Sequence, residues 1–250
     1  VPGEMYEGEN LQLHVEVTDP GSDPLGRPHN ILWDLDGDRV YDDASGSDPL
    51  VPWAALEALG LASNGMPNVI SVMVDDGEEH GVSYLRGTLK INNLAPVPDA
   101  GSNDTIILNE QATPAYVINE GRPLWVDARG TTDPDANDNL VYAWDIYADG
   151  IIDYFAGSDP VAFIPWQVLE DAGVPGDGEP IRLRLIVSDQ ETNGQALRAH
   201  DDVPLIVNNV DPVADAGGPY MINEGDRGIL LDGSGSYDIN ANDDMRAPRN

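Results

Sequence analysis

The sequence repeats itself at an interval of about a hundred residues, and this repetition limits the available folds more than any other feature. The 17 residues that begin at Trp33 align without a gap with those that begin at Trp144, and eight are identical. The 11 residues that begin at Ile91 match those that begin at Val207 at seven positions. Matched segments are offset by 104 to 116 residues, which is the size of an immunoglobulin-type β-sandwich rather than of a solenoid repeat.

The repeats divide the 250-residue chain into two full units and the beginning of a third. We place these domains at residues 1–95, 96–211 and 212–250. The second begins with an extended segment that contains an additional apolar strand at 105–108. The third contains candidate strands at 220–222 and 228–231 but lacks the segment with the repeated tryptophan. Because a third of a sandwich cannot bury its own faces, we expect more of the chain or a partner to complete it.

Apolar and polar residues alternate within each unit, which is the pattern of half-buried β-strands. It predicts strands at 11–17 and at 181–187, where Ile186 interrupts the polar face. Further candidate strands, separated by Gly, Asn, Asp and Pro turns, are 69–74 and 203–207. Pro204 would confine the last of these to a sheet edge or a strand start. Each unit also has one amphipathic run that begins after a proline, at Trp53 or Trp166, and ends at a glycine, which predicts a short helix. The predicted fold class is all-β, with tandem immunoglobulin-like sandwiches that each carry one short helix, plus a partial third unit.

Four of the tryptophans recur in pairs at equivalent positions. Trp33 and Trp144 each lie in an apolar strand, which favours a place in the core over an exposed place that stacks on a sugar. Trp53 and Trp166 lie on the predicted helices, where packing is also the favoured interpretation.

Two segments resemble a known domain family. The stretch DPDANDNLVYAWD from Asp133 to Asp145 and the linker VNNVDPVADAGGPYMINEG from Val207 to Gly225 resemble PKD domains and related bacterial immunoglobulin-like repeats. The turn reads WDLDGD and WDIYADG here, where that family has WDFGDG, and the helix is not part of a minimal PKD domain. The resemblance implies enlarged PKD-like sandwiches of a large bacterial surface or extracellular protein.

Acidic residues dominate the charge: 45 Asp and Glu face 12 Lys and Arg, for a net charge of -33. Such a surface repels the phosphates of nucleic acids and anionic lipids, so we expect neither as a partner. No run approaches the roughly 18 apolar residues of a membrane span, so we expect no direct membrane insertion. The chain has no cysteine, which excludes disulfides and thiolate sites.

Aspartates gather in turns rich in Gly and Asn, and calcium favours such loops because it takes six to eight oxygen ligands. The predicted metal ligands are Asp34, Asp36, Asp38, Asp42 and Asp43 in the first turn, Asp145, Asp149 and Asp153 in its copy, and Asp133, Asp135 and Asp138 in a second cluster. The second cluster is echoed by Asp238, Asn240, Asp243 and Asp244. Because Tyr147 stands where the first turn has Asp36, the copy should bind more weakly or not at all. Ordinary turn chemistry is the alternative interpretation for all of these residues.

A short opening motif begins each unit and ends in an acidic residue and a glycine. It reads MYEG at Met5, YVINEG at Tyr116 and YMINEG at Tyr220. Its acidic residues, Glu7, Glu120 and Glu224, are placed to reach an ion at a junction between repeats.

The sequence contains no catalytic constellation, since its four histidines are scattered and it has neither a nucleophile elbow nor a phosphate-binding loop. We therefore expect a non-enzymatic structural region of an extracellular or cell-surface protein. It would form a stalk, filament or surface layer, bind Ca2+ and associate with neighbouring repeats or chains. One alternative is an adhesin or glycan-binding module that uses aromatics such as Tyr41, Tyr84 and Tyr154 to contact a surface glycan or protein. Another is a set of accessory domains of a secreted hydrolase.

Overall fold

The computed structural model describes residues 3–18, 29–61, 64–77, 81–189, 196–225 and 227–240, with the backbone alone at residues 64 and 65. It divides into two compact units. Unit 1 comprises Val1–Pro96, Thr132–Leu140 and Ser188–Arg198, and unit 2 comprises Val97–Thr131, Val141–Val187 and Ala199–Asn250. The described residues form strands and two short helices, so the predicted all-β class of immunoglobulin-like sandwiches is confirmed.

Unit 1 contains a five-stranded and a two-stranded sheet. The larger has the order β1 (Glu4–Tyr6), β7 (Val82–Asn92), β6 (Asn64–Asp75), β3 (Asn30–Asp34) and β4 (Ala44–Ser45). The smaller pairs β2 (Leu11–Gln12) with β5 (Leu50–Val51). The first strand, β1, runs parallel to the last, β7, while the other pairs are antiparallel.

One hydrophobic core joins the two sheets of unit 1. Trp33 and Ile70 enter it from the larger sheet, Leu11 from the smaller one, and Trp53 and Leu56 from the helix α1 (Trp53–Ala58). Trp33 is 2% exposed and its indole Nε1 donates to the carbonyl of Gly46 at 2.9 Å. The predicted place of this tryptophan in the core is confirmed.

Unit 2 repeats this arrangement with one additional strand. Its larger sheet has the order β12 (Tyr154–Gly157), β11 (Leu140–Ile146), β14 (Ile181–Asp189), β15 (Arg198–Asn208), β9 (Gln111–Asn119) and β8 (Asp104–Leu108). The smaller sheet pairs β10 (Leu124–Asp127) with β13 (Val161–Ile164), and α2 (Trp166–Asp171) follows it. As in unit 1, the strand with the opening motif, β9, runs parallel to the last strand, β15. Trp144 is fully buried in the core of this unit, as predicted, whereas Trp166 is only half-buried.

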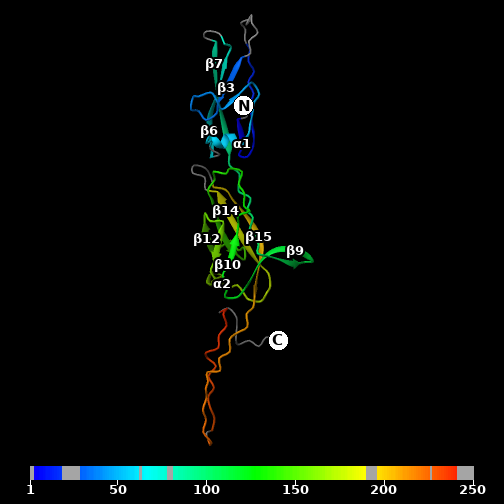
Figure 1. Cartoon of the computed structure of the whole chain (residues 1–250), viewed down its shortest axis with the longest axis vertical. Coiled ribbons are helices and arrows are strands. Elements are labelled where there is room, and N and C mark those ends of the chain that lie inside the picture. Colours follow the sequence, from blue (N-terminus) through cyan, green and yellow to red (C-terminus); the bar gives the residue numbers. More distant parts are fainter. Residues whose placement is uncertain are drawn as a thin grey trace. The chain divides into compact units, whose positions relative to one another are not determined.

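The additional strand, predicted at 105–108, is β8, and it forms an edge of the larger sheet. It pairs with β9 through a tight turn in which Asn109 and Glu110 have φ values of 50° and 65°. Two consecutive residues with positive φ are typical of a type I′ hairpin. Figure 1 shows this hairpin extending away from the rest of unit 2.

The two helices begin and end where the sequence predicts. Each follows a proline, Pro52 or Pro165, and each is followed by a glycine in the left-handed region, Gly60 at φ 72° and Gly173 at φ 78°. Both helices have six residues, and no helix in the described part of the chain is long and apolar enough to cross a membrane.

Three strand predictions need correction. The strand predicted at 11–17 is regular only at Leu11–Gln12, because Pro49 opposite it has no N–H to return a ladder hydrogen bond. Pro204 lies inside β15 and not at its start, and this is tolerated because the pairing with β9 begins only at Leu205. The segments 220–222 and 228–231 are not strands, since neither finds a partner strand within the described residues of the third repeat.

Candidate functional site

The aspartate-rich turn after β3 is organised by its own first carboxylate. Asp34 is 2% exposed and accepts hydrogen bonds from the backbone N–H of Gly37 at 2.7 Å and of Arg39 at 3.2 Å. The hydroxyl of Ser71 on β6 donates to the same carboxylate at 3.1 Å. Arg39 has a φ of 74°, which is unfavourable for a residue other than glycine, so the hydrogen bond to Asp34 helps to hold this backbone conformation.

The other predicted ligands of this turn lie near Asp34 but are more exposed. One carboxylate oxygen each of Asp34, Asp36 and Asp38 lies within 4.8 Å of the others. Asp36 and Asp38 are exposed, and each accepts a backbone N–H from two residues further on. Asp42 is exposed, whereas Asp43 is half-buried and accepts the N–H of Leu35 at 2.6 Å. Three of the five carboxylates can therefore converge, but all three also serve the turn itself.

The copy in unit 2 keeps this scaffold but does not gather three carboxylates. Asp145 is fully buried and accepts the N–H groups of Asp149 at 3.1 Å and Gly150 at 2.9 Å. Tyr147 occupies the place of Asp36 with φ 75°. The three carboxylates that converge in unit 1 are those of Asp34, Asp36 and Asp38, and Asp145, Asp149 and Asp153 form no such group within the described residues.

The gapless alignment pairs Asp153 with Asp42, but the structure gives Asp153 the role of Asp43. Asp43 accepts the N–H of Leu35, and Asp153 accepts the equivalent N–H of Ile146 at 2.7 Å. A β-bulge in the pairing of β11 with β12 takes up the difference of one residue.

Burial raises the pKa of Asp43 and Asp153 above the ordinary value of 3.8, and the charges of Asp145 and Asp149 raise that of Asp153 further. A carboxyl whose pKa is raised by folding binds its proton more tightly in the native state. Its contribution to stability is therefore present below pH 3.8 and is lost as the pH rises through the folded pKa.

We expect Asp153→Asn to raise the melting temperature at pH 7, measured in EGTA, by roughly 1–3 °C. The amide oxygen still accepts the N–H of Ile146, while the charge that opposes Asp145 and Asp149 is removed. Thermal melting of variant and wild type at pH 3.5 and pH 7 tests this, because the gain should disappear at the lower pH. A variant that melts lower than the wild type at pH 7 contradicts it.

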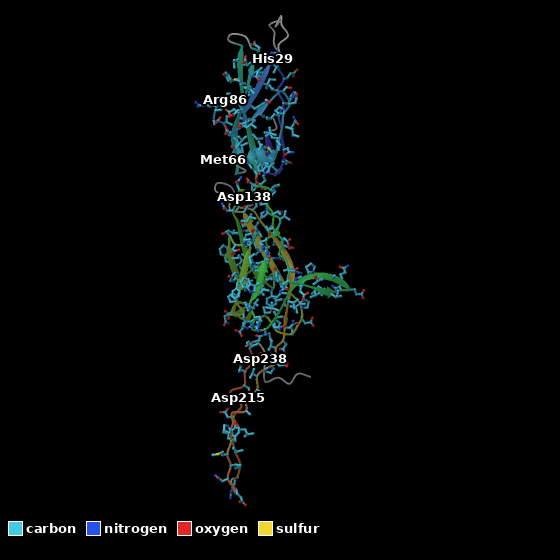
Figure 2. The ribbon with its side chains drawn as sticks, in the orientation of Figure 1. His29, Met66, Arg86, Asp138, Asp215 and Asp238 are labelled. Carbon is cyan, nitrogen blue, oxygen red and sulfur yellow. The ribbon has the colours of Figure 1, made fainter. Side chains whose placement is uncertain are left out.

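A second carboxylate cluster lies within unit 1 and joins the first opening motif to residues 133–138. Glu7, Asp133 and Asp138 each offer one oxygen, and these oxygens lie within 4.8 Å of one another. Glu7 is 1% exposed and accepts the backbone N–H of Leu94 at 2.8 Å. Figure 2 places Asp138 at the opposite end of unit 1 from His29. We call Glu7, Asp133 and Asp138 the Glu7 cluster.

The helix α1 holds the segment that carries the two aspartates. The indole Nε1 of Trp53 donates to the carbonyl of Pro134 at 2.9 Å, and the carboxylate of Glu57 accepts the N–H of Ala136 at 2.9 Å. Asp135, also predicted as a ligand, is 6% exposed, and its N–H donates to Asp133 Oδ1 at 3.0 Å. The turn therefore presents the Asp133 carboxylate in a fixed orientation.

A buried amide, that of Asn93, precedes Leu94, the residue whose N–H donates to Glu7. Asn93 Nδ2 donates to Asp189 Oδ2 at 3.2 Å, and the following residue, Leu94, donates to Glu7. Asn93 Oδ1 is buried and accepts no hydrogen bond from the described residues. A buried acceptor without a donor costs about 1–3 kcal/mol, and coordination of a hard cation is one way to satisfy it.

The equivalent place in unit 2 is filled by an amide. Glu120 is 3% exposed and accepts the N–H of Val210 at 2.7 Å, as Glu7 accepts that of Leu94. Asn240, which stands where the other repeat has Asp135, is fully buried and donates Nδ2 to Glu120 Oε1 at 2.8 Å. Asp238 resembles Asp133 in accepting an N–H two residues on. Asp243 and Asp244, which the sequence also matches to the second cluster, lie outside the described residues. Glu224 of the third opening motif is exposed.

Of the three aromatic residues that the sequence suggested for ligand contact, only Tyr84 is exposed. Tyr84 is 62% exposed and lies against Tyr41, with ring centroids 5.6 Å apart, while Tyr154 is half-buried. Sequence reasoning missed Trp125, which is 60% exposed beside Phe163, because it lies between two apolar residues in what reads as a continuous apolar run. Its counterpart in the first repeat is Gln12, and this contrast was the available signal.

No protein-family model and no curated protein matches the sequence. Among solved structures, Drosophila N-cadherin EC1-4 is 15% identical, with 86% of this chain and 50% of that chain covered and a TM-score of 0.33. The insect immune protein hemolin is 14% identical, with 83% and 44% covered and a TM-score of 0.39. A nucleoside hydrolase-related hypothetical protein from Saccharophagus degradans is 24% identical over 47% of this chain and 26% of that chain, with a TM-score of 0.29. The chain spans half or less of the length of each of these three proteins.

Proposed function

We propose that this chain is a non-enzymatic structural region of a repeat protein and that Ca2+ bound by the Glu7 cluster stabilises unit 1. The observation that carries the proposal is the convergence of three carboxylates around a residue, Glu7, that is only 1% exposed. Carboxylates at this spacing repel one another, and a divalent cation offsets that repulsion.

The ligand chemistry favours a hard cation. All the ligand atoms of the cluster are carboxylate oxygens. Asn93, which precedes Leu94, has a buried amide oxygen that accepts no hydrogen bond from the described residues, and we propose it as a further ligand. Calcium accepts such mixtures of carboxylate and carbonyl oxygen in flexible geometry. The chain has no cysteine, so no thiolate favours a softer metal.

The remaining predicted ligands are proposed as weaker sites. The carboxylates of Asp34 and Asp145 already accept two or more hydrogen bonds within their turns, so they act first as turn scaffolds. The amide of Asn240 fills the equivalent place beside Glu120, which would lower the affinity of that site for a cation. The ion at the Glu7 cluster is therefore expected to dominate.

A calcium-stabilised acidic repeat fits an extracellular or cell-surface array, where calcium sites with dissociation constants near 10⁻⁴–10⁻³ M are useful. The net charge of -33 keeps chains apart in the absence of cations, and bound calcium would lower that repulsion. We propose a PKD-like stalk, filament or surface layer in which neighbouring repeats or chains associate.

We expect calcium at 100 times its dissociation constant to stabilise unit 1 by about 2.7 kcal/mol, which corresponds to a rise in melting temperature of roughly 8–15 °C. Glu7→Gln should reduce this rise to below about 2 °C, because it removes a charged ligand. Its amide oxygen still accepts the N–H of Leu94, so the fold should persist. Thermal melting of both proteins in EGTA and in added calcium gives the comparison.

The matched control is Glu110→Gln, which makes the same change of charge at the exposed tip of the β8–β9 hairpin. It should keep the full response to calcium. Sodium chloride at equal ionic strength controls for screening. If calcium raises the wild-type melting temperature no more than sodium does, or if Glu7→Gln keeps the full rise, the proposed site is wrong.

A further inference from the structure

The outer face of the small sheet of unit 2 carries two exposed aromatic rings. Trp125 on β10 is 60% exposed, and Phe163, directly opposite it on β13, is 41% exposed. Their ring centroids are 4.9 Å apart with an interplanar angle of 69°. In this edge-to-face arrangement the edge of one ring packs against the face of the other. Aromatic surface on both rings therefore remains open to solvent.

These rings are not needed for the core. Leu124, Val126 and Ile164, which alternate with them along the two strands, are completely buried on the opposite face. In unit 1 the equivalent pair on β2 and β5 is Gln12 and Leu50. The Gln12 amide there donates to backbone carbonyls, so the small sheet of unit 1 forms without an aromatic ring at this position.

A fixed polar pair lies beside the rings on the same face. Asp127 follows Trp125 by two residues on β10, which places it on the same side of the strand. Its two oxygens accept hydrogen bonds from Arg129 Nε at 2.9 and 3.0 Å, and Arg129 Nη2 donates to one of them as well. The guanidinium holds the pKa of Asp127 below its ordinary value, so the pair stays ionised at neutral pH.

We propose that this face, formed by Trp125, Phe163, Asp127 and Arg129, binds a neutral polysaccharide, and that β-1,4-linked glucose or N-acetylglucosamine chains are its ligands. Sugars of this class carry their hydroxyls around the ring edge, which leaves C–H-covered faces that pack on aromatic rings. The charges of Asp127 and Arg129 neutralise each other, so the face attracts neither anions nor cations strongly. Arg129 has five N–H donors and gives only some of them to Asp127, so others are available to ring-edge hydroxyls.

Affinity electrophoresis in gels that contain hydroxyethylcellulose or glycol chitin tests this proposal with the full chain in calcium. We expect at least one of these polysaccharides to retard the wild type. Trp125→Ala should weaken the retardation by about tenfold or more, as truncation of a central aromatic contact does. Arg129→Gln should weaken it less, because it removes donors but leaves the rings.

Phe155→Ala is the matched control, since Phe155 is 65% exposed on β12, which belongs to the larger sheet and not to the β10–β13 pair. It should migrate as the wild type does. The proposal is overturned if neither polysaccharide retards the wild type, or if Trp125→Ala and Phe155→Ala weaken retardation equally. Sedimentation of the same proteins adds a further test: if Trp125→Ala abolishes dimerisation and leaves retardation intact, the face is a contact between chains instead.

Discussion

Trp144→Ala is expected to lower the free energy of unfolding of unit 2 by about 3–5 kcal/mol. The side chain is completely buried and meets Tyr116 edge-on, with ring centroids 6.4 Å apart and an interplanar angle of 86°. Such a pair adds about 0.5–1.5 kcal/mol beyond the buried area. The neighbour cannot move to fill the cavity, because the Tyr116 hydroxyl donates to Ala100 at 2.8 Å and accepts the N–H of Asp127 at 2.9 Å.

Urea unfolding followed by circular dichroism measures this loss, and the chain provides a control of the same chemistry. Trp125→Ala removes the same side chain from the exposed face of β10, where it is 60% exposed. It should change the free energy of unfolding by less than about 1 kcal/mol. Equal losses from the two substitutions would contradict the distinction between a core tryptophan and a surface tryptophan.

The sequence predicted three strands well from their apolar residues and from the turn residues that bound them. The ranges 69–74, 181–187 and 203–207 lie inside β6, β14 and β15. Residues 11–17 alternate equally well, but the regular strand stops at Gln12, since pairing also depends on the segment opposite. That segment contains Pro49, and alternation within one strand carries no information about its partner.

The candidate site was predictable in its parts and not in its assembly. Spacing identified the turn of Asp34 because its members are consecutive in the sequence. The Glu7 cluster joins residue 7 to Asp133 and Asp138, more than a hundred residues away, so only the folded chain shows that these carboxylates meet. The opening motif indicated that Glu7 could reach an ion, but nothing in the sequence specified the partners. The bulge that gives Asp153 the role of Asp43 was equally hidden, because the alignment had no gap.

Asp34→Ala is expected to lower the free energy of unfolding of unit 1 by about 3 kcal/mol, and by the same amount in EGTA and at a calcium concentration that fills only the Glu7 cluster. The carboxylate is 2% exposed, and its removal leaves the N–H groups of Gly37 and Arg39 and the hydroxyl of Ser71 without their acceptor. Each lost hydrogen bond to this charged acceptor lowers the stability, and the positive φ of Arg39 adds strain that nothing then offsets.

The calcium dependence of this loss separates the two roles of an acidic turn. Denaturant unfolding of Asp34→Ala in EGTA and in calcium should give equal losses, whereas Glu7→Gln should lose stability only in calcium. Asp34→Asn keeps one acceptor oxygen and should fall between alanine and the wild type in both conditions. A scaffold acts through hydrogen bonds that exist without the ion, while a ligand acts only when the ion is bound. If the loss from Asp34→Ala is seen only in calcium, Asp34 is a ligand, and the dominant ion belongs in the turn and not at the Glu7 cluster.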